Sequence, residues 1–164
     1  MATVLQLQDV GKLVKLDPAL EAGELEHRCI YALPGMIPRL RDELPAWTSQ
    51  WKVEISPLEQ YDAFLEVFCS GETLTFGPQF RPLNHLGEGI WEMKTPDLRI
   101  FGWFNVVDSF IAGAIDLAWN VKNGNLYAGH CGVVAHHRRL LDLDEPKFVR
   151  GEDPTNVVSS YNYP

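Results

Sequence analysis

The sequence is poor in cysteine and in positive charge, and it has no long apolar run. Its three cysteines, Cys29, Cys69 and Cys131, are widely spaced and odd in number, which argues against both a disulfide framework and a Cys-x-x-Cys metal site. No segment approaches the roughly 18 apolar residues of a membrane-spanning helix. The first residues lack the basic and then apolar order of a secretory signal. We therefore expect a cytoplasmic protein with reduced thiols that does not enter a membrane.

Signatures of bound cofactors and metals are missing as well. No glycines follow a predicted strand in the G-x-G-x-x-G or P-loop spacing, and no G-x-S-x-G elbow suggests a serine hydrolase. His130 and His137 are seven residues apart, a longer spacing than the i, i+4 pair that chelates zinc on a helix. No carboxylate cluster completes a ligand set. We expect neither a cofactor nor a metal ion.

Basic residues are outnumbered, with 14 Lys and Arg against 22 Asp and Glu, giving a net charge of −8. This balance weighs against a protein whose main task is to grip phosphate backbones. The charge is uneven, because residues 80–141 hold six basic and five acidic residues. That near-neutral region permits local contact with RNA but does not by itself predict it.

The residues that are present indicate a single domain with a real core. Of the 164 residues, 46% are hydrophobic and 22% are charged, which is typical of a compact fold. The most informative stretch runs from Gly89 to Lys122 and contains three alternating runs, GIWEMK, LRIFGWF and SFIAGAI. Turn residues separate the runs, including a Thr-Pro-Asp break after the first. This pattern predicts an antiparallel meander in which Arg99, Phe101 and Trp103 share one face of the middle strand.

Helices are predicted on either side of this meander. Ser56-Pro57-Leu58-Glu59 has the residues of a capping box with proline in the first turn, and Ser70-Gly71 ends that helix. Asn125 to Leu141 is the second predicted helix. Upstream, EHRCIYAL reads as a strand and PRLRDELPAW as a short helix, whereas residues 73–85 are rich in Pro, Gly and Phe and read as a loop.

The order of these elements resembles the RelE/ParE superfamily of bacterial toxins, most closely its phage-associated HigB branch. The W-E-[LM]-[RK] strand of the family matches WEMK, its xRIxxxF strand matches LRIF, and WKVEIS with the helix after it matches the first strand and helix. The resemblance covers roughly residues 51–141 and lies in the order of the elements. It implies an α+β fold, a mostly antiparallel twisted sheet with helices packed on it. Residues 1–50 would then be an extension packed on the core, not independent of it, and residues 142–164 an extended acidic tail.

The resemblance also implies an activity. Toxins of this superfamily are metal-independent endoribonucleases that cut mRNA, generally on the ribosome, and an antitoxin inhibits them. Position by position, Arg99 matches the central-strand arginine of the family, and Lys122 matches the basic residue after the last strand. Lys94, Tyr127 and His85 are weaker catalytic candidates. The partners implied are mRNA with the ribosome and an antitoxin, and a homodimer is compatible with the sequence.

Plainer roles stay open for each of these residues. Arg99 could pair with Glu92 across the hairpin, Lys94 could be a solvated edge-strand lysine, Lys122 could lie on the surface, and Tyr127 could belong to the core. A second function also stays open, that of a catalytically inactive RelE-like phage or prophage protein that binds and modulates a host protein. The acidic charge and the added N-terminal residues favour it. Whether the chain is an enzyme is therefore undecided from the sequence.

Overall fold

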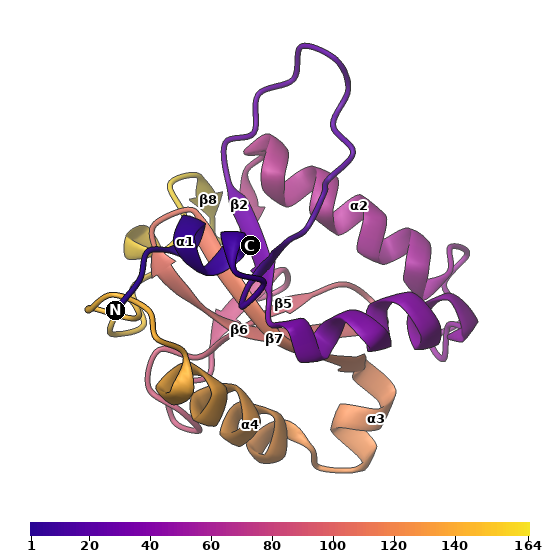
Figure 1. The fold of residues 1–164 in the computed structure, drawn as a ribbon. Coiled ribbons are helices and arrows are strands. Elements are labelled where there is room, and N and C mark those ends of the chain that lie inside the picture. Colours follow the sequence, from indigo (N-terminus) through magenta and orange to yellow (C-terminus); the bar gives the residue numbers. More distant parts are fainter.

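A six-stranded, mostly antiparallel sheet forms the centre of the computed structural model, which describes residues 1–164 (Figure 1). Across the sheet the strands are β1 (Val14–Lys15), β2 (Cys29–Ala32), β7 (Ser109–Leu117), β6 (Leu98–Val106), β5 (Trp91–Lys94) and β4 (Phe80–Pro82). Within this sheet, only β2 and β7 run parallel to each other. Together with the helices, this sheet confirms the predicted α+β fold.

Helices cover both faces of the sheet. The two longest, α2 (Pro57–Ser70) and α4 (Tyr127–Leu140), lie on opposite sides of it (Figure 1). Alternation along β6 fits this arrangement, because Ile100 and Phe104 join the core beneath α2, whereas Phe101 and Trp103 join the core beneath α4. The predicted meander and its two faces are thus confirmed. No helix is long and apolar enough to cross a membrane.

The capping box predicted for α2 is present. The Ser56 hydroxyl accepts a hydrogen bond from the Glu59 N–H, and the Glu59 side chain accepts one from the Ser56 N–H. The helix ends at Gly71, whose φ of 84° is a left-handed conformation that glycine adopts without strain. A short helix that the sequence did not reveal, α3 (Ala118–Asn123), joins β7 to α4.

The prediction of a strand at residues 51–56 is wrong. These residues form irregular backbone, with Trp51 and Ile55 exposed and Lys52 at a positive φ of 57°. Neither face of the segment is buried, so its alternating apolar residues have no core to enter. Besides β6, the neighbour of β7 is β2, which lies within the first fifty residues and is paired along its whole length with β7.

Other local expectations need correction. Residues 73–85, predicted as a loop, contain two strands, β3 (Leu74–Thr75) and β4. β4 extends the six-stranded sheet beside β5. The short helix predicted around PRLRDELPAW is present, and it consists of 3₁₀ and π-helical turns instead of a regular α-helix. These are the 3₁₀ turn η1 (Pro34–Met36), the π-helical turn η2 (Arg39–Glu43) and the 3₁₀ turn η3 (Leu44–Ala46). The N-terminus forms a single capped helix, α1 (Val4–Asp9).

The last residues return to the body of the protein. Phe148 contacts the Arg138 side chain, and the Val149 N–H donates to the Phe104 carbonyl. Further on, η4 (Pro154–Asn156) is followed by two fully buried residues, Val157 and Val158. The chain then ends with β8 (Tyr161–Asn162), which pairs in parallel with β3. The C-terminal segment is thus part of the core packing.

Candidate functional site

Polar side chains gather at the end of the sheet where the β5–β6 hairpin turns. The register places Lys94 opposite Arg99 and Arg99 opposite Asp116, and one row further in it places Arg81 opposite Glu92. Directly opposed residues extend from the same face of a sheet, and here that face is the one beneath α4. We call the following residues the polar site: Arg81, Glu92, Lys94, Arg99, Asp116 and His130.

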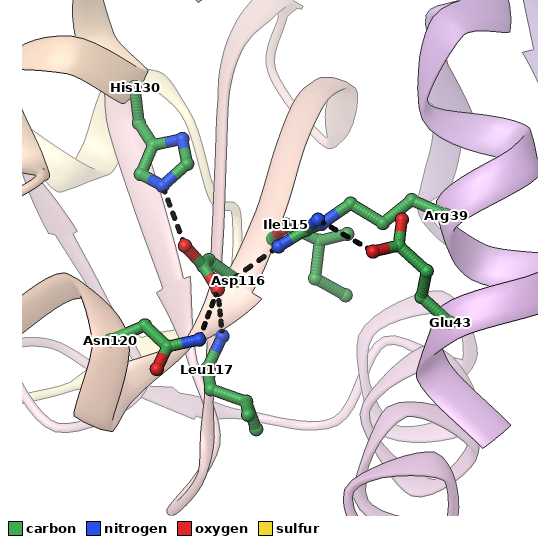
Figure 2. A network of polar contacts seen from close by, with 7 residues as sticks. All are labelled: Arg39, Glu43, Ile115, Asp116, Leu117, Asn120 and His130. Atoms are coloured by element: carbon green, nitrogen blue, oxygen red, sulfur yellow. Dashed lines mark hydrogen bonds and ion pairs between the residues drawn. The ribbon is translucent and has the colours of Figure 1, made fainter. Parts of the chain in front are cut away.

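Asp116 is the centre of the best-connected part of this site (Figure 2). One carboxylate oxygen accepts hydrogen bonds from the Leu117 N–H at 2.8 Å and the Asn120 amide at 3.2 Å, and it pairs with Arg39 at 3.1 Å. The other oxygen lies 3.0 Å from Nε2 of His130. Residues from η2, β7, α3 and α4 therefore converge on one buried carboxylate.

These contacts change the acidity of Asp116. Burial alone raises the pKa of a carboxyl group, because it disfavours the charged form. Here the hydrogen bonds from His130, Asn120 and the Leu117 N–H, together with the charge of Arg39, outweigh burial and hold the pKa of Asp116 below its usual value. Asp116 is consequently an anion at neutral pH.

His130 presents one ring nitrogen to Asp116 and keeps the other free. Its ring stacks on Phe101 with a centroid distance of 4.9 Å and an interplanar angle of 18°. The side chain is 22% exposed, and Nδ1 has no hydrogen-bond partner in the protein. An aspartate that fixes one nitrogen of a histidine orients the ring and leaves the other nitrogen to exchange a proton with a bound molecule. The pair therefore has the arrangement of a general base with its orienting carboxylate.

Arg81 and Glu92 form the second ion pair of the site. Arg81 donates through Nε to Glu92, whose carboxylate is fully buried, and its guanidinium lies over the Tyr127 ring at 5.6 Å. Burial lowers the pKa of Arg81, but the hydrogen bond and charge of Glu92, together with Tyr127, outweigh burial and raise the pKa. The second oxygen of Glu92 is buried without a partner. Glu92 therefore pairs with Arg81, and not with Arg99 as one reading of the sequence suggested.

The two cations at the hairpin differ in what they can do. Arg99 is only 5% exposed, and its guanidinium donates to the carbonyl groups of Thr95 and Leu98. Lys94 is half-buried and has no carboxylate partner; its ammonium lies 3.3 Å from the Gly77 carbonyl. Burial and the charge of Arg99 lower the pKa of Lys94, although Glu92 partly opposes them. Lys94 therefore gives up its proton more readily than an ordinary lysine.

An open pocket of about 490 Å³ adjoins these two cations. It lies between α2 and the hairpin turn, with Lys94 and Arg99 on one side and Phe64 and Val67 on the other. Its lining contains no carboxylate. The pocket is large enough for a small ligand, and its charge suits an anion.

The other two sequence candidates lie at different distances from the site. Lys122, in α3, is close enough that its charge contributes to the lowered pKa of Lys94. His85 is exposed in the loop that joins β4 to β5, near the start of β5, where Pro82 pairs with Trp91. Lys94 is the last residue of β5 and therefore lies at the opposite end of that strand. The structure thus brings Lys94 next to Arg99 with Lys122 nearby, places Tyr127 beside Arg81 and leaves His85 apart.

The protein has neither a cluster of metal ligands nor a reactive thiol among Cys69 and Cys131. No three His, Cys, Asp or Glu side chains are placed to hold a metal ion. Burial raises the pKa of Cys69 to about 12 and that of Cys131 to about 11, so both stay protonated at neutral pH. The reactive groups of the site are therefore its histidine, its lysine and its arginines.

Three residues of the site were missed by reasoning from the sequence: Arg81, Asp116 and His130. Asp116 ends an apolar strand, and a charged residue at that point could have been noticed. The pairing with His130, fourteen residues further on, depends on how α4 is oriented on the sheet. No local sequence pattern indicates that orientation.

Comparison of the chain with known protein families, with curated proteins and with solved structures found no match.

Proposed function

We propose that this protein is a RelE-like, HigB-like toxin, a metal-independent endoribonuclease that acts on mRNA, with the ribosome as its site of action. The observation that carries the proposal is the polar site, where an Asp–His pair and cations from three strands meet at one end of the sheet. Cleavage through the 2′-hydroxyl needs only a base, an acid and positive charge around the phosphate. The site offers all three without a metal ion.

The roles follow from what each side chain already contacts. His130 Nδ1 takes the proton of the 2′-hydroxyl, while Asp116 holds the ring through Nε2 and stabilises the imidazolium that forms. The 2′-oxygen bonds to the adjacent phosphorus, and the bond from phosphorus to the 5′-oxygen breaks. Lys94 gives its proton to that leaving oxygen, a step that its lowered pKa favours. The products are a 2′,3′-cyclic phosphate and a 5′-hydroxyl.

The proposed acid lies two strands away from the carboxylate that orients the proposed base. Lys94 and Asp116 are joined through Arg99 across three neighbouring strands, which places their backbones about 10 Å apart. Arg81 and Lys122 add charge that stabilises the phosphorane. Arg99 already donates to two backbone carbonyls, so it acts mainly by positioning the hairpin and by its charge.

Expression in bacteria tests this proposal. Induced wild-type protein should arrest growth and fragment mRNA, whereas His130→Ala and Lys94→Ala should each reduce cleavage by about 100-fold or more, the usual contribution of one acid or base. His136→Ala, an exposed histidine on the same helix, is the matched control and should behave as wild type. If mRNA is fragmented to the same extent in His130→Ala, His130 is not the general base.

One observation favours the alternative, that the chain is a catalytically inactive RelE-like protein that binds a host protein. Two of the arginines at the site are already bonded within the protein, Arg81 to Glu92 and Arg99 to backbone carbonyls, and the net charge is −8. An acidic protein suits a basic partner. Normal growth and intact mRNA on expression of soluble, folded wild-type protein would support this alternative.

A further inference from the structure

Two tryptophans lie side by side on the surface next to the polar site. Trp51 precedes α2 and Trp119 lies in α3, and their rings are 5.5 Å apart at an interplanar angle of 65°. They are 42% and 44% exposed, whereas Trp91 and Trp103 are fully buried. Large aromatic side chains usually bury most of their surface, and exposed aromatic pairs mark binding sites. Nothing in the fold itself explains why these two rings meet in the open.

Positive charge accompanies the pair. The Lys122 ammonium lies over the Trp51 ring at 5.4 Å, and Lys122 is one turn after Trp119 on α3, so that both extend from one side of the helix. Lys52, which follows Trp51, is exposed as well. In a protein of net charge −8, Lys122 beside two exposed indoles forms a local site for an aromatic ligand that carries negative charge.

The backbone around Trp51 is held in place before any ligand arrives. The buried carboxylate of Asp97 accepts hydrogen bonds from the Gln50 N–H at 3.1 Å and the Trp51 N–H at 3.4 Å. A third hydrogen bond joins the Val53 N–H to the Ser49 hydroxyl at 2.9 Å. A preorganised ring loses less conformational entropy on binding than a mobile one. The loop is therefore built to present Trp51.

The position of the pair relates it to the polar site. Trp119 comes three residues after Asp116, and the charge of Lys122 contributes to the lowered pKa of Lys94. A strand of nucleic acid that crosses the polar site would thus pass the two indoles. Unpaired bases expose the faces that stack on aromatic side chains, whereas bases within a duplex do not.

We propose that Trp51, Trp119 and Lys122 bind single-stranded RNA, the indoles by stacking on an unpaired base and Lys122 by contacting the neighbouring phosphate. The choice of RNA as the ligand rests on the proposed function. The inference adds the substrate class, because it restricts the enzyme to unpaired segments. It also gives Lys122 a second role, because this lysine would bind the RNA in addition to stabilising the phosphorane by its charge.

Binding to an uncleavable oligonucleotide tests this inference. The probe is a fluorescent 2′-O-methyl oligoribonucleotide, which lacks the hydroxyl needed for cleavage, and the readout is fluorescence anisotropy. Wild-type protein should bind the single strand, and a duplex of the same sequence should bind on the order of tenfold more weakly or less. Trp51→Ala and Trp119→Ala should each weaken binding of the single strand on the order of tenfold. Tyr163→Ala, an exposed aromatic residue in the C-terminal segment, is the matched control.

Each outcome decides the inference. Unchanged affinity in both tryptophan variants, equal binding of the duplex, or no binding by wild type would overturn it, provided that circular dichroism shows the variants to be folded. Adenosine monophosphate provides a further arm, and if it binds as tightly as the oligonucleotide, the site is one for free nucleotides and not for RNA strands. Because the probe cannot be cleaved, a failure of the nuclease proposal leaves this result intact, and binding can fail while cleavage persists.

Discussion

Single side chains at the polar site are held by several contacts at once, and Asp116 has the most of them. Its carboxylate accepts from His130, Asn120 and the Leu117 N–H, besides its ion pair with Arg39. Removing such a carboxylate leaves buried donors without a partner, which costs more than the lost hydrogen bonds alone. Asp116 therefore contributes to stability as well as to the position of His130.

Replacement of Asp116 by alanine tests this double role. We expect Asp116→Ala to lower the free energy of unfolding by about 3 kcal/mol, because buried partners lose their acceptor. Urea denaturation measures the change. Asp42→Ala is the control, since Asp42 pairs with Arg41 on the open surface, and it should leave the urea midpoint where it is in the wild type.

The lowered pKa of Asp116 has a consequence for stability in acid. A carboxyl group whose folded pKa is below its unfolded value stabilises the fold fully above the unfolded pKa of about 3.9. That contribution is lost as the pH falls through the lower folded pKa. The difference in unfolding free energy between wild type and Asp116→Asn should therefore be constant from about pH 7 to pH 5 and shrink below about pH 4. A difference that stayed constant in acid would show that the charge of Asp116 is not what stabilises the fold.

At the scale of elements, the close pairing of β6 with β7 sets strict limits on side-chain size. The register shifts between Phe101 and Gly102, and a Cβ on Gly102 would lie 2.1 Å from the Ile111 carbonyl oxygen. Backbone at that distance cannot yield without moving the strands. This glycine is therefore required by the sheet, and two residues of the polar site, Arg99 and Asp116, lie on the same two strands.

Two glycine substitutions should act in opposite directions. Gly102→Ala should destabilise the protein by about 3 kcal/mol or more, because the added methyl group meets backbone. Gly132→Ala, in α4, should stabilise it by about 1 kcal/mol, since nothing lies within 4 Å of the added carbon. Thermal denaturation of the two variants beside wild type measures both changes. Similar melting temperatures for the two variants would contradict the account of the strand pair.

The elements that sequence reasoning predicted correctly are those fixed by neighbouring residues. The alternation around Arg99 and the capping box at Ser56 are local patterns, and both were confirmed. Residues 51–56 also alternate, but alternation predicts a strand only where one face is buried, and here Trp51 remains exposed. The position of β2 beside β7 could not be predicted, because the pairing joins residues eighty apart, as in Cys29 with Ser109.

The same distinction applies to the candidate site. The hairpin brings Lys94 and Arg99 together, and this proximity could be read from the two strands and their turn. The pair of Asp116 with His130 depends on how α4 packs across the sheet, which is a property of the whole core. The sequence therefore revealed two cations of the site, Lys94 and Arg99, but neither Arg81 nor the pair of Asp116 with His130.

For the molecule as a whole, the C-terminal segment closes the core that supports the site. Val157 and Val158 are buried in the same cluster as the residues of α2, and burying each side chain contributes about 1.5–3 kcal/mol. Together they approach the net stability of a small domain, about 5–15 kcal/mol. The segment is thus needed for folding even though it lies far from the polar site in sequence.

Two truncated chains test whether the C-terminal segment is needed for folding or is a dispensable tail. A chain that ends at Gly151 loses both valines and should unfold or aggregate, whereas a chain that ends at Asn162 loses only exposed residues and should melt near the wild-type temperature. The soluble fraction after expression and the melting temperature measure the outcome. A stable, soluble protein ending at Gly151 would show that the segment does not complete the core.

If the polar site cleaves RNA through the 2′-hydroxyl without a metal ion, the chemical groups at the new RNA ends will show it. Messenger RNA isolated after induction of the wild-type protein should carry fragments ending in a 2′,3′-cyclic phosphate or the 3′-phosphate derived from it. These ends should be missing from cells that express His130→Ala. Fragments that end in a 3′-hydroxyl, or mRNA that stays intact while folded protein accumulates, would contradict the account.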